Sequence, residues 1–408
     1  MNILFIHPNF PGQFLYLSRH MAQVDGHRVM FLTKSTNGNR IGKVTTAVYK
    51  PLHEPEKKTH VFARPLEEAV IEGQSVYHAM QILRDQHHFT PDVIIGHTGW
   101  GSMLYCKDLF PEVPVIGYFE WYYRAYGSDV GYFPGEEVSE EDKMRIRTRN
   151  AHHLLGLESC DVLFTPTQWQ RAQFPLPYRL QMKVIHEGVD TEFCRPQPGR
   201  KLVLEKREGH EALDLSGAEE IVTYVSRGLE PYRGYPQFIS AVAFLLKKRP
   251  KLHVVVVGQD RSCYGAAPQG TTWKEVMDKQ IDYDRKRVHF VGHLDRASYQ
   301  TVLQASTVHV YLTRPFVLSW SMLEAMSFGC ALVASKTPPV EEVVEDGRNG
   351  LLANFRSPQH IAQRIEELLD DAELRKCLGR AARETILDRY DMRDCVRRQT
   401  DMVYGALK

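Results

Sequence analysis

Short apolar runs recur along this chain, with longer amphipathic segments between them. They are too short for core helices, are rich in valine and isoleucine and lack polar alternation, which is typical of parallel strands buried on both faces. In the first half of the chain they lie at 2–7, 28–33, 92–97, 114–119 and 161–166. Helical patterns separate them at 13–25, 66–86, 99–109 and 141–159. This alternation predicts a doubly wound α/β sheet.

The same alternation restarts in the second half. Strands are predicted at 221–226, 252–258, 287–292, 307–313 and 331–335. Helices are predicted at 235–249, 295–305, 321–329, 358–370, 372–388 and 391–406. Proline and glycine at 196–199 predict a linker. We therefore predict two Rossmann-like lobes facing each other across a cleft, at 1–190 and 191–388, and a C-terminal helix in 389–408 that packs back on the first lobe.

Charge and cysteine usage exclude several function classes. The chain has 51 Lys and Arg residues against 50 Asp and Glu residues. Its net charge is therefore close to zero and does not favour binding to nucleic acid or to anionic lipid. The seven scattered cysteines form no CxxC pair, which argues against a zinc site or a disulfide framework and fits a reducing cytosol. The first residues do not resemble a signal peptide, and no segment reaches the roughly 18 apolar residues of a membrane span. We expect a cytoplasmic protein.

Ligands of open α/β sheets bind beyond the carboxyl ends of the strands, so the loops there are the places to search. One such region, SWSMLEAMSFGC at 319–330, reads as a helix start. Ser321 and Glu324 stand in the S-x-x-E relation of a capping box. Glu324 has two interpretations: it closes this box, or it holds a ligand at the positive end of the helix.

Four segments of the second half resemble retaining glycosyltransferases of family four, which have the GT-B fold. They are SRGLEPYRG (226–234), VHFVGHLD (288–295), SWSMLEAMSFGCALVAS (319–335) and VEDGRNGLL (344–352). NFPGQF (9–14) and HEGVDTEF (186–193) are similar to the loop of the first lobe and to the crossover between lobes. Together they span nearly the whole chain in the family's order.

The resemblance implies a nucleotide-sugar donor held mainly by the second lobe. Arg227 and Arg233 match the residues that grip the diphosphate and stabilise the leaving group. Glu324 matches the residue that accepts hydrogen bonds from the ribose. Gly12, in the first-lobe loop, allows close approach of the backbone to a ligand. The remaining donor contacts lie at the base-binding turn and at the helix start: Gly292, Leu294, Ser319, Trp320, Ser321 and Met322.

Two positions depart from the family pattern. Phe316 stands where the family has a second glutamate, eight residues before Glu324, and as a ring it would wall the sugar pocket. Glu120 stands near the place where many relatives have a histidine, and it could bind a sugar hydroxyl or take the acceptor proton. The acceptor residues expected around it are His97, Trp121, Tyr122 and Arg124, because aromatic rings stack on sugar faces. The alternatives are a packed aromatic cluster and a structural His97.

A charged stretch at 140–153, EEDKMRIRTRNAHH, favours a solvated helix, with a patch for a lipid-linked acceptor at a membrane surface as the alternative. The sequence has no DxD-type pair in a convincing loop, so we expect no bound metal. It also has no G-x-G-x-x-G stretch after the first strand, which argues against NAD or FAD, and we expect no cofactor.

The hypothesis is a retaining transferase, catalysed by Arg227, Arg233 and Glu120, that moves a sugar from a UDP- or GDP-sugar to a glycan, glycolipid or other hydroxyl acceptor. It implies polysaccharide, lipopolysaccharide or glycoconjugate assembly, no nucleic-acid partner, and peripheral contact with the inner membrane face as an option. The alternatives are a sugar-nucleotide epimerase or a phosphorylase on the same fold, and a non-catalytic nucleotide-sugar-binding partner.

Overall fold

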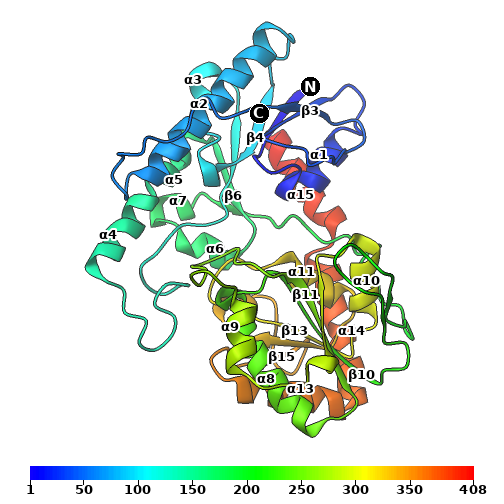
Figure 1. Ribbon diagram of the computed structural model, residues 1–408. Helices are drawn as coiled ribbons and strands as arrows, with labels where there is room; N and C mark the ends of the chain where they lie inside the picture. Colours follow the sequence, from blue (N-terminus) through cyan, green and yellow to red (C-terminus); the bar gives the residue numbers. More distant parts are fainter. The chain divides into compact units, whose positions relative to one another are not determined.

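The computed structural model describes residues 1–408, whose main strands form two parallel sheets, each at the centre of one unit (Figure 1). The first unit comprises residues 1–131, 135–188 and 392–408, and the second comprises 132–134 and 189–391. The chain therefore crosses into the second unit after Gly188 and leaves it at Met392. The stretch 196–199, predicted as the linker, lies inside the second unit.

The first unit has a seven-stranded parallel sheet in the order β3-β2-β1-β4-β5-β6-β7. Its strands are β1 (Asn2–Ile6), β2 (Arg28–Thr33), β3 (Thr45–Val48), β4 (Val93–His97), β5 (Val115–Tyr118), β6 (Val162–Thr165) and β7 (Lys183–Val184). Its helices are α1 (Leu15–Met21), α2 (Arg64–Asp85), α3 (Cys106–Leu109), α4 (Glu140–Arg149), α5 (Ala151–Ser159), α6 (Gln168–Gln173), α7 (Leu176–Arg179) and α15 (Met392–Gly405). The short edge strands β3 and β7 were not predicted, because neither has a sustained apolar run.

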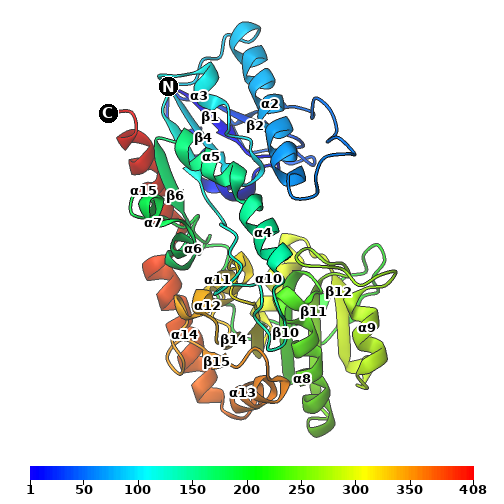
Figure 2. The same cartoon turned by 90° about the vertical axis from the view of Figure 1, so that its left-hand side faces the viewer.

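The helix predicted over 141–159 is two helices, α4 and α5, which meet at Asn150 (Figure 2). The Asn150 side chain holds both backbone groups of Tyr123: Oδ1 accepts from its N–H at 2.9 Å, and Nδ2 donates to its carbonyl at 2.8 Å. An asparagine that bonds backbone outside its helix favours a helix end over a helix interior. The long helical pattern is interrupted at this residue.

The helix predicted over 99–109 is also wrong in extent. A 3-10 turn, Thr98–Trp100, ends at Gly101, and only Cys106–Leu109 forms an α-helix. Gly101 has φ +84°, and a Cβ there would lie 2.4 Å from the carbonyl oxygen of Ala69. Helix α2 passes too close for any larger residue, so the left-handed turn breaks the helix.

The second unit has a six-stranded parallel sheet in the order β12-β11-β10-β13-β14-β15. Its strands are β10 (Glu220–Gly228), β11 (Leu252–Gln259), β12 (Val288–Gly292), β13 (Val308–Tyr311), β14 (Leu332–Ser335) and β15 (Leu351–Ala353). Its helices are α8 (Tyr235–Lys248), α9 (Trp273–Gln280), α10 (Arg296–Gln304), α11 (Trp320–Ser327), α12 (Pro338–Glu341), α13 (Pro358–Asp370) and α14 (Ala372–Arg389). An antiparallel pair, β8 (Val203–Leu204) and β9 (Leu213–Asp214), precedes them and was not predicted.

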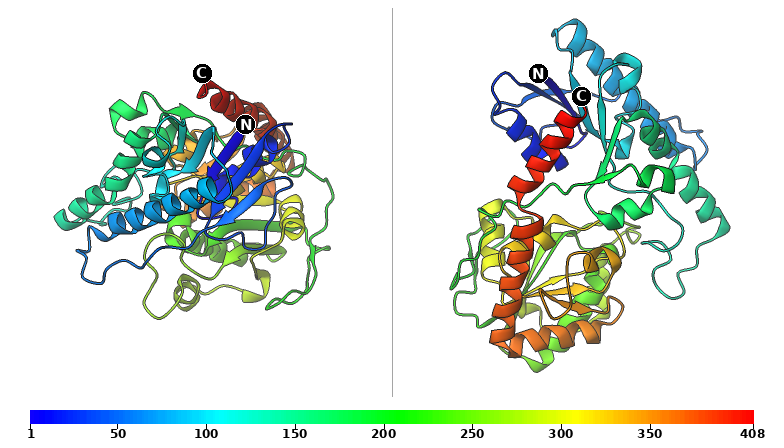
Figure 3. Two further views of the ribbon diagram at one scale, coloured as in Figure 1. Left: turned by 90° about the horizontal axis from the view of Figure 1, so that it is seen from above. Right: turned by 180° about the vertical axis from the view of Figure 1, so that it is seen from behind.

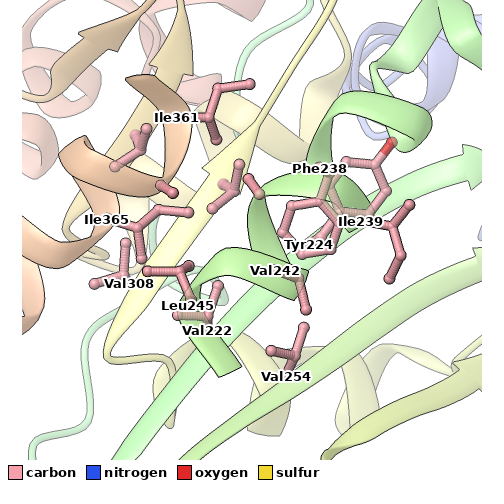
Figure 4. Packing of buried hydrophobic residues seen from close by; sticks show 14 of the residues in the cluster. Val222, Tyr224, Phe238, Ile239, Val242, Leu245, Val254, Val308, Ile361 and Ile365 are labelled. Carbon is pink, nitrogen blue, oxygen red and sulfur yellow. The ribbon is translucent and has the colours of Figure 1, made fainter. Parts of the chain in front are cut away.

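Strand β10 shows why these strands read as continuous apolar runs. Val222 and Tyr224 point into the cluster under α8 and α13, whereas Ile221 belongs to the cluster on the opposite face. Figure 4 shows the first cluster, in which the Tyr224 ring stacks on Phe238 of α8 with centroids 4.5 Å apart. Both faces of the strand are buried, so neither face selects polar residues.

The last helix, α15, belongs to the first unit and packs on α1 (Figure 3). The chain leaves the first unit after Gly188 and returns to it at Met392, and these two residues are in close contact. Gly188 has φ +91°, and a Cβ on it would lie 2.5 Å from the Cα of Met392. A glycine is therefore required at position 188, because the backbone of Met392 passes too close for any side chain.

Each sheet reverses its winding between two neighbouring strands, β1 and β4 in the first unit and β10 and β13 in the second. Ligands of doubly wound sheets bind outside the carboxyl ends of the strands at such switch points. The loops after these four strands are therefore where each unit is built to bind. No helix of the chain is both long and apolar enough to cross a membrane.

Candidate functional sites at the two switch points

In the second unit, helix α11 begins beside the switch point, at the end of the loop that follows β13. Its N-cap is Ser319, not Ser321: the Ser319 hydroxyl accepts from the Ser321 N–H, and its own N–H donates to the Tyr311 hydroxyl at 2.8 Å. The predicted capping box is therefore wrong. Glu324 lies in the second turn, where it cannot reach the cap, and this removes helix capping as an explanation for its carboxylate.

The Glu324 carboxylate is instead tied to α10. Its Oε2 accepts from the Tyr299 hydroxyl at 2.7 Å, and Oε1 has no partner within the chain. Burial raises the pKa of Glu324, while the Tyr299 hydrogen bond and the charge of Arg296 oppose that rise. A carboxylate with one oxygen fixed and the other unused can accept from a neighbouring hydroxyl group.

The two arginines of the loop after β10 differ in their surroundings. Arg227 is exposed. Arg233 is buried, and its Nη1 donates to Thr313 Oγ1 at 3.0 Å, to the Val317 carbonyl at 2.8 Å and to the Tyr311 hydroxyl at 3.2 Å. Arg233 therefore joins the loop after β10 to the loop after β13. The two were predicted to act alike on a diphosphate, and only Arg227 presents its charge at the surface.

Sequence reasoning missed Glu230, which lies between these arginines and is fully buried. Its Oε2 accepts from the backbone N–H groups of Cys263 and Tyr264, and Oε1 has no hydrogen-bond partner. Burial raises the pKa of Glu230, against the lowering effect of those two hydrogen bonds and of both arginines. An acid placed between two arginines in a glycine-containing loop was the available signal.

Phe316 belongs to an aromatic cluster. Its ring centroid lies 5.1 Å from that of Tyr264 and 5.5 Å from that of Tyr232, and the Arg233 guanidinium lies 5.8 Å from it. The Tyr264 ring lies 5.1 Å from the same guanidinium, so this chain has two rings against a buried cation where the family has a carboxylate.

The turn after β12 forms the floor of a cavity of about 590 Å³. Gly292 has φ +63°, and the His210 imidazole occupies the space that its Cβ would take. Arg207 donates to the carbonyls of Val291 and His293, both at 3.1 Å. Leu294 is buried in the core, so only its backbone could meet a ligand.

The other predicted residues at the start of α11 also divide by exposure. Met322 is fully buried in the core, and Ser321 is 7% exposed. Trp320 is 46% exposed. The backbone N–H groups of Ser321 and Met322 donate to the hydroxyl and the carbonyl of Ser319, so their predicted contribution to a donor site is through the positive end of the helix.

At the switch point of the first unit, Glu120 belongs to a cluster of four polar side chains. Gln13 Nε2 donates to Glu120 Oε1 at 2.9 Å, and Gln13 Oε1 lies 2.8 Å from His7 Nε2. His97 Nε2 lies 3.7 Å from Glu120 Oε2. Burial, followed by the neighbouring His97, lowers the pKa of His7 to about 3. Sequence reasoning selected Glu120 and His97 but missed His7 and Gln13.

Gly12 has a structural explanation in this cluster. It has φ +50°, and a Cβ on it would lie 2.5 Å from His7 Nε2. The imidazole of His7, rather than a ligand, occupies the space above this glycine. The predicted donor contact of Gly12 remains untested.

Of the predicted acceptor residues beyond Glu120, Trp121 is buried, whereas Tyr122 and Arg124 line a cavity of about 680 Å³ together with residues of α4. Trp121 is 6% exposed, so its ring cannot stack on a sugar. Tyr122 packs on Phe174 with centroids 5.5 Å apart, and Arg124 Nη1 lies 3.4 Å from the Ala172 carbonyl. The exposed tryptophan at this edge is Trp100, whose ring lies 4.6 Å from His97 and 5.2 Å from His7. Sequence reasoning missed Trp100 because it lies in a turn, directly after Gly99, where no helical or strand periodicity marks a residue as exposed or buried.

Helix α4 and the start of α5 carry the charged stretch at 140–153. Lys143 pairs with Glu140 and Arg145 with Asp142, while the Arg149 guanidinium lies 4.1 Å from the Tyr123 ring centroid. Much of its charge is thus neutralised on the helix itself. In the whole chain, no three His, Cys, Asp or Glu side chains are gathered where they could hold a metal ion.

Two family models match the chain. The glycosyl transferase family 4 group matches residues 25–194, and glycosyl transferases group 1 matches residues 205–385. An uncharacterized glycosyltransferase of Methanocaldococcus jannaschii is 28% identical over 216 residues, which are 52% of this chain and 50% of that protein. D-inositol 3-phosphate glycosyltransferase of Corynebacterium efficiens is 24% identical over 250 residues, 60% of this chain and 57% of that protein. The chain thus spans about half the length of these curated relatives.

Among solved structures, Anabaena HepE in complex with UDP-glucose matches with a TM-score of 0.70 and 18% identity, over 99% of this chain and 100% of that chain. At this identity the likeness shows the fold, which is the predicted GT-B fold of two Rossmann-like units. The two family models fall on the two halves of the chain that were predicted as separate lobes. The chain belongs to the family-four, group 1 glycosyltransferases.

Proposed function

We propose that this protein is a retaining glycosyltransferase that uses a nucleoside-diphosphate sugar, a UDP- or GDP-sugar, as donor and a hydroxyl group of a glycan or glycolipid as acceptor. The observation that carries the proposal is Glu324. Its carboxylate is fixed on one side by Tyr299 and open on the other, close to the start of a helix at the switch point of the second sheet. A nucleoside diphosphate offers a pair of ribose hydroxyls for the carboxylate and anionic oxygens for the helix start.

The diphosphate would be held by two kinds of positive groups. The exposed Arg227 supplies a full charge, and the first backbone N–H groups of α11 supply the helix dipole. Arg233 already donates hydrogen bonds to Thr313, Val317 and Tyr311. It therefore acts by holding the loop after β10 against the loop after β13. The cavity above Gly292 has room for a nucleobase.

In the proposed reaction, the bond between the anomeric carbon and the diphosphate oxygen breaks while the acceptor oxygen bonds to that carbon from the same face. The acceptor proton passes to the leaving phosphate oxygen. Arg227 and the helix start stabilise the negative charge that develops on the diphosphate. Binding both substrates in one orientation supplies the rest of the rate enhancement. Because side chains and backbone supply the positive charge, we propose that turnover needs no metal.

UDP-glucose bound to the similarly folded HepE supports this donor class, and the glycosyltransferase relatives support the reaction class. We further propose a role in polysaccharide, lipopolysaccharide or other glycoconjugate synthesis in the cytoplasm, at the inner face of the membrane when the acceptor is a lipid.

The experiment is a screen of UDP- and GDP-sugars, with nucleoside diphosphate release as the first readout and NMR of the product anomer as the second. The proposal predicts release with at least one donor and a product with the donor's anomeric configuration. Nucleotide binding without turnover across a broad acceptor panel would make the protein a binding partner, and an inverted product would refute retention.

A further inference from the structure

The hydrogen bonds around Glu120 fix where the protons of the cluster lie. The backbone N–H of Asn9 donates to His7 Nδ1 at 2.9 Å, so the proton of the neutral His7 ring is on Nε2. That N–H can only donate to the Gln13 amide oxygen, which turns the Gln13 amide nitrogen toward Glu120. Each hydrogen bond in this series determines the orientation of the next, and we call the series from His7 through Gln13 to Glu120 the positioning chain.

His97 has the same arrangement from another strand. The Gly99 N–H donates to His97 Nδ1 at 3.0 Å, so the ring proton is again on Nε2. This Nε2 is buried without a hydrogen-bond partner, and Glu120 Oε2, at 3.7 Å, is the facing acceptor. Both carboxylate oxygens of Glu120 therefore face N–H donors that backbone amides hold in place.

The Glu120 backbone is fixed as well, since the buried Gln170 side chain donates to its carbonyl at 2.7 Å. The carboxylate itself remains 31% exposed. The Trp100 ring, 40% exposed, lies 4.6 Å from the ring of His97, the same residue whose Nε2 faces Glu120. A fixed anionic acceptor next to an exposed aromatic face suits a sugar, whose hydroxyls need acceptors and whose C–H faces need apolar cover.

We infer that the first unit holds a saccharide subsite in which Glu120 accepts a sugar hydroxyl beside the Trp100 ring, with Gln13 and His7 as positioning residues. The inference rests on the proposed function for the identity of the reaction. It moves the aromatic contact from Trp121, which is buried, to Trp100.

Gln13→Glu tests the positioning chain with little change in shape. The new carboxylate would face both His7 Nε2 and Glu120. An opposite charge at this distance raises the protonation midpoint of His7 by about one to three pH units, and a like charge raises the pKa of Glu120. The matched control is Gln23→Glu, the same change at an exposed glutamine of the same region.

The other charged and titratable groups near Glu120 are His97, Tyr118, Tyr123 and, through Tyr118, Glu187. None of them is altered by either substitution, so a change seen only in Gln13→Glu belongs to the His7–Gln13–Glu120 chain.

The first readout needs no ligand. In ¹⁵N NMR of labelled histidines, His7 and His97 of the wild type should show the Nε2–H tautomer, and the His7 midpoint should rise in Gln13→Glu but not in Gln23→Glu. An Nδ1–H tautomer at His7, or a midpoint that stays unchanged in Gln13→Glu, would overturn the positioning chain. Melting curves verify that each variant is folded.

The second readout is the pH profile of nucleoside diphosphate release from whichever UDP- or GDP-sugar the screen identifies. The required form of Glu120 is the carboxylate, so its acid limb should move up by about one pH unit in Gln13→Glu. Trp100→Leu should raise the acceptor KM more than it lowers kcat. An unmoved acid limb and an unchanged acceptor KM would overturn the subsite. If no donor turns over, the proposed function fails, yet the histidine spectra still decide the positioning chain.

Discussion

Arg227 and Arg233 stand in the same loop of the sequence but differ in burial and in hydrogen bonding. One is exposed at the switch point of the second sheet, and the other is buried with one nitrogen bonded to three oxygens. Arg233→Ala should lower the free energy of unfolding by about 1–3 kcal/mol or more, because buried acceptors lose their donor. Arg227→Ala should change it by less than about 0.5 kcal/mol.

Urea unfolding of the two variants measures this difference. Equal stability losses would contradict the assignment of Arg233 to structure and of Arg227 to the surface.

The raised pKa of Glu324 has a consequence for stability against pH. The folded state holds its proton more tightly than the unfolded state, so this carboxyl lowers stability as pH rises through the folded-state pKa. Glu324→Gln removes the charge and keeps an acceptor for Tyr299. The variant should therefore gain stability relative to wild type as pH rises from the ordinary glutamate range toward neutrality.

Melting temperatures of both proteins across that pH range test the expectation. A difference that is constant with pH would show that the carboxyl is not perturbed by burial.

At the scale of single residues, sequence could indicate which segments matter but not which atoms face out. Glu324 and Glu120 were found because each stands in a recognisable loop after a strand. The capping box at Ser321 failed because the helix begins earlier, at a cap that Tyr311 orients across 8 residues. His7, Gln13 and Glu230 were missed because their partners come from distant strands and loops, and contacts of that kind leave no local pattern.

At the scale of elements, the joint between α4 and α5 depends on Asn150, whose amide bonds the backbone of Tyr123 on both sides. Asn150→Ala should cost about 1–3 kcal/mol, because two buried backbone groups lose their partners. The matched control is the exposed Asn39→Ala, which should cost little. Chemical unfolding of both variants checks this, and equal effects would show that the joint does not hold the loop.

Most strands and long helices were predictable, because burial on both faces or on one stripe repeats over many residues. Short edge strands such as β7 were not, since two residues carry no period. The breaks at Gly101 and Asn150 depend on close approach to α2 and on Tyr123, which are tertiary causes. The division of the chain after Gly188 was expected two residues later, at 190, and depends on a contact with Met392 that sequence does not reveal.

At the scale of the whole molecule, the proposed donor site draws its positive charge from Arg227 and from the start of α11. Turnover should therefore persist in EDTA. Loss of activity on chelation, with recovery on adding magnesium or manganese, would contradict this assignment, and a chelated known metalloenzyme serves as the control for the assay.

If the second unit binds a nucleoside diphosphate through Glu324 and Arg227, as we propose, calorimetric titration with UDP and GDP will measure that binding. We expect binding by the wild type and by the exposed control Arg380→Ala. Glu324→Gln and Arg227→Ala should each bind about tenfold more weakly, which is about 1.4 kcal/mol, with a melting temperature near that of the wild type for Arg227→Ala and at or above it for Glu324→Gln. Wild-type affinity in both variants would contradict the claim and move the donor site away from α11 and the loop after β10.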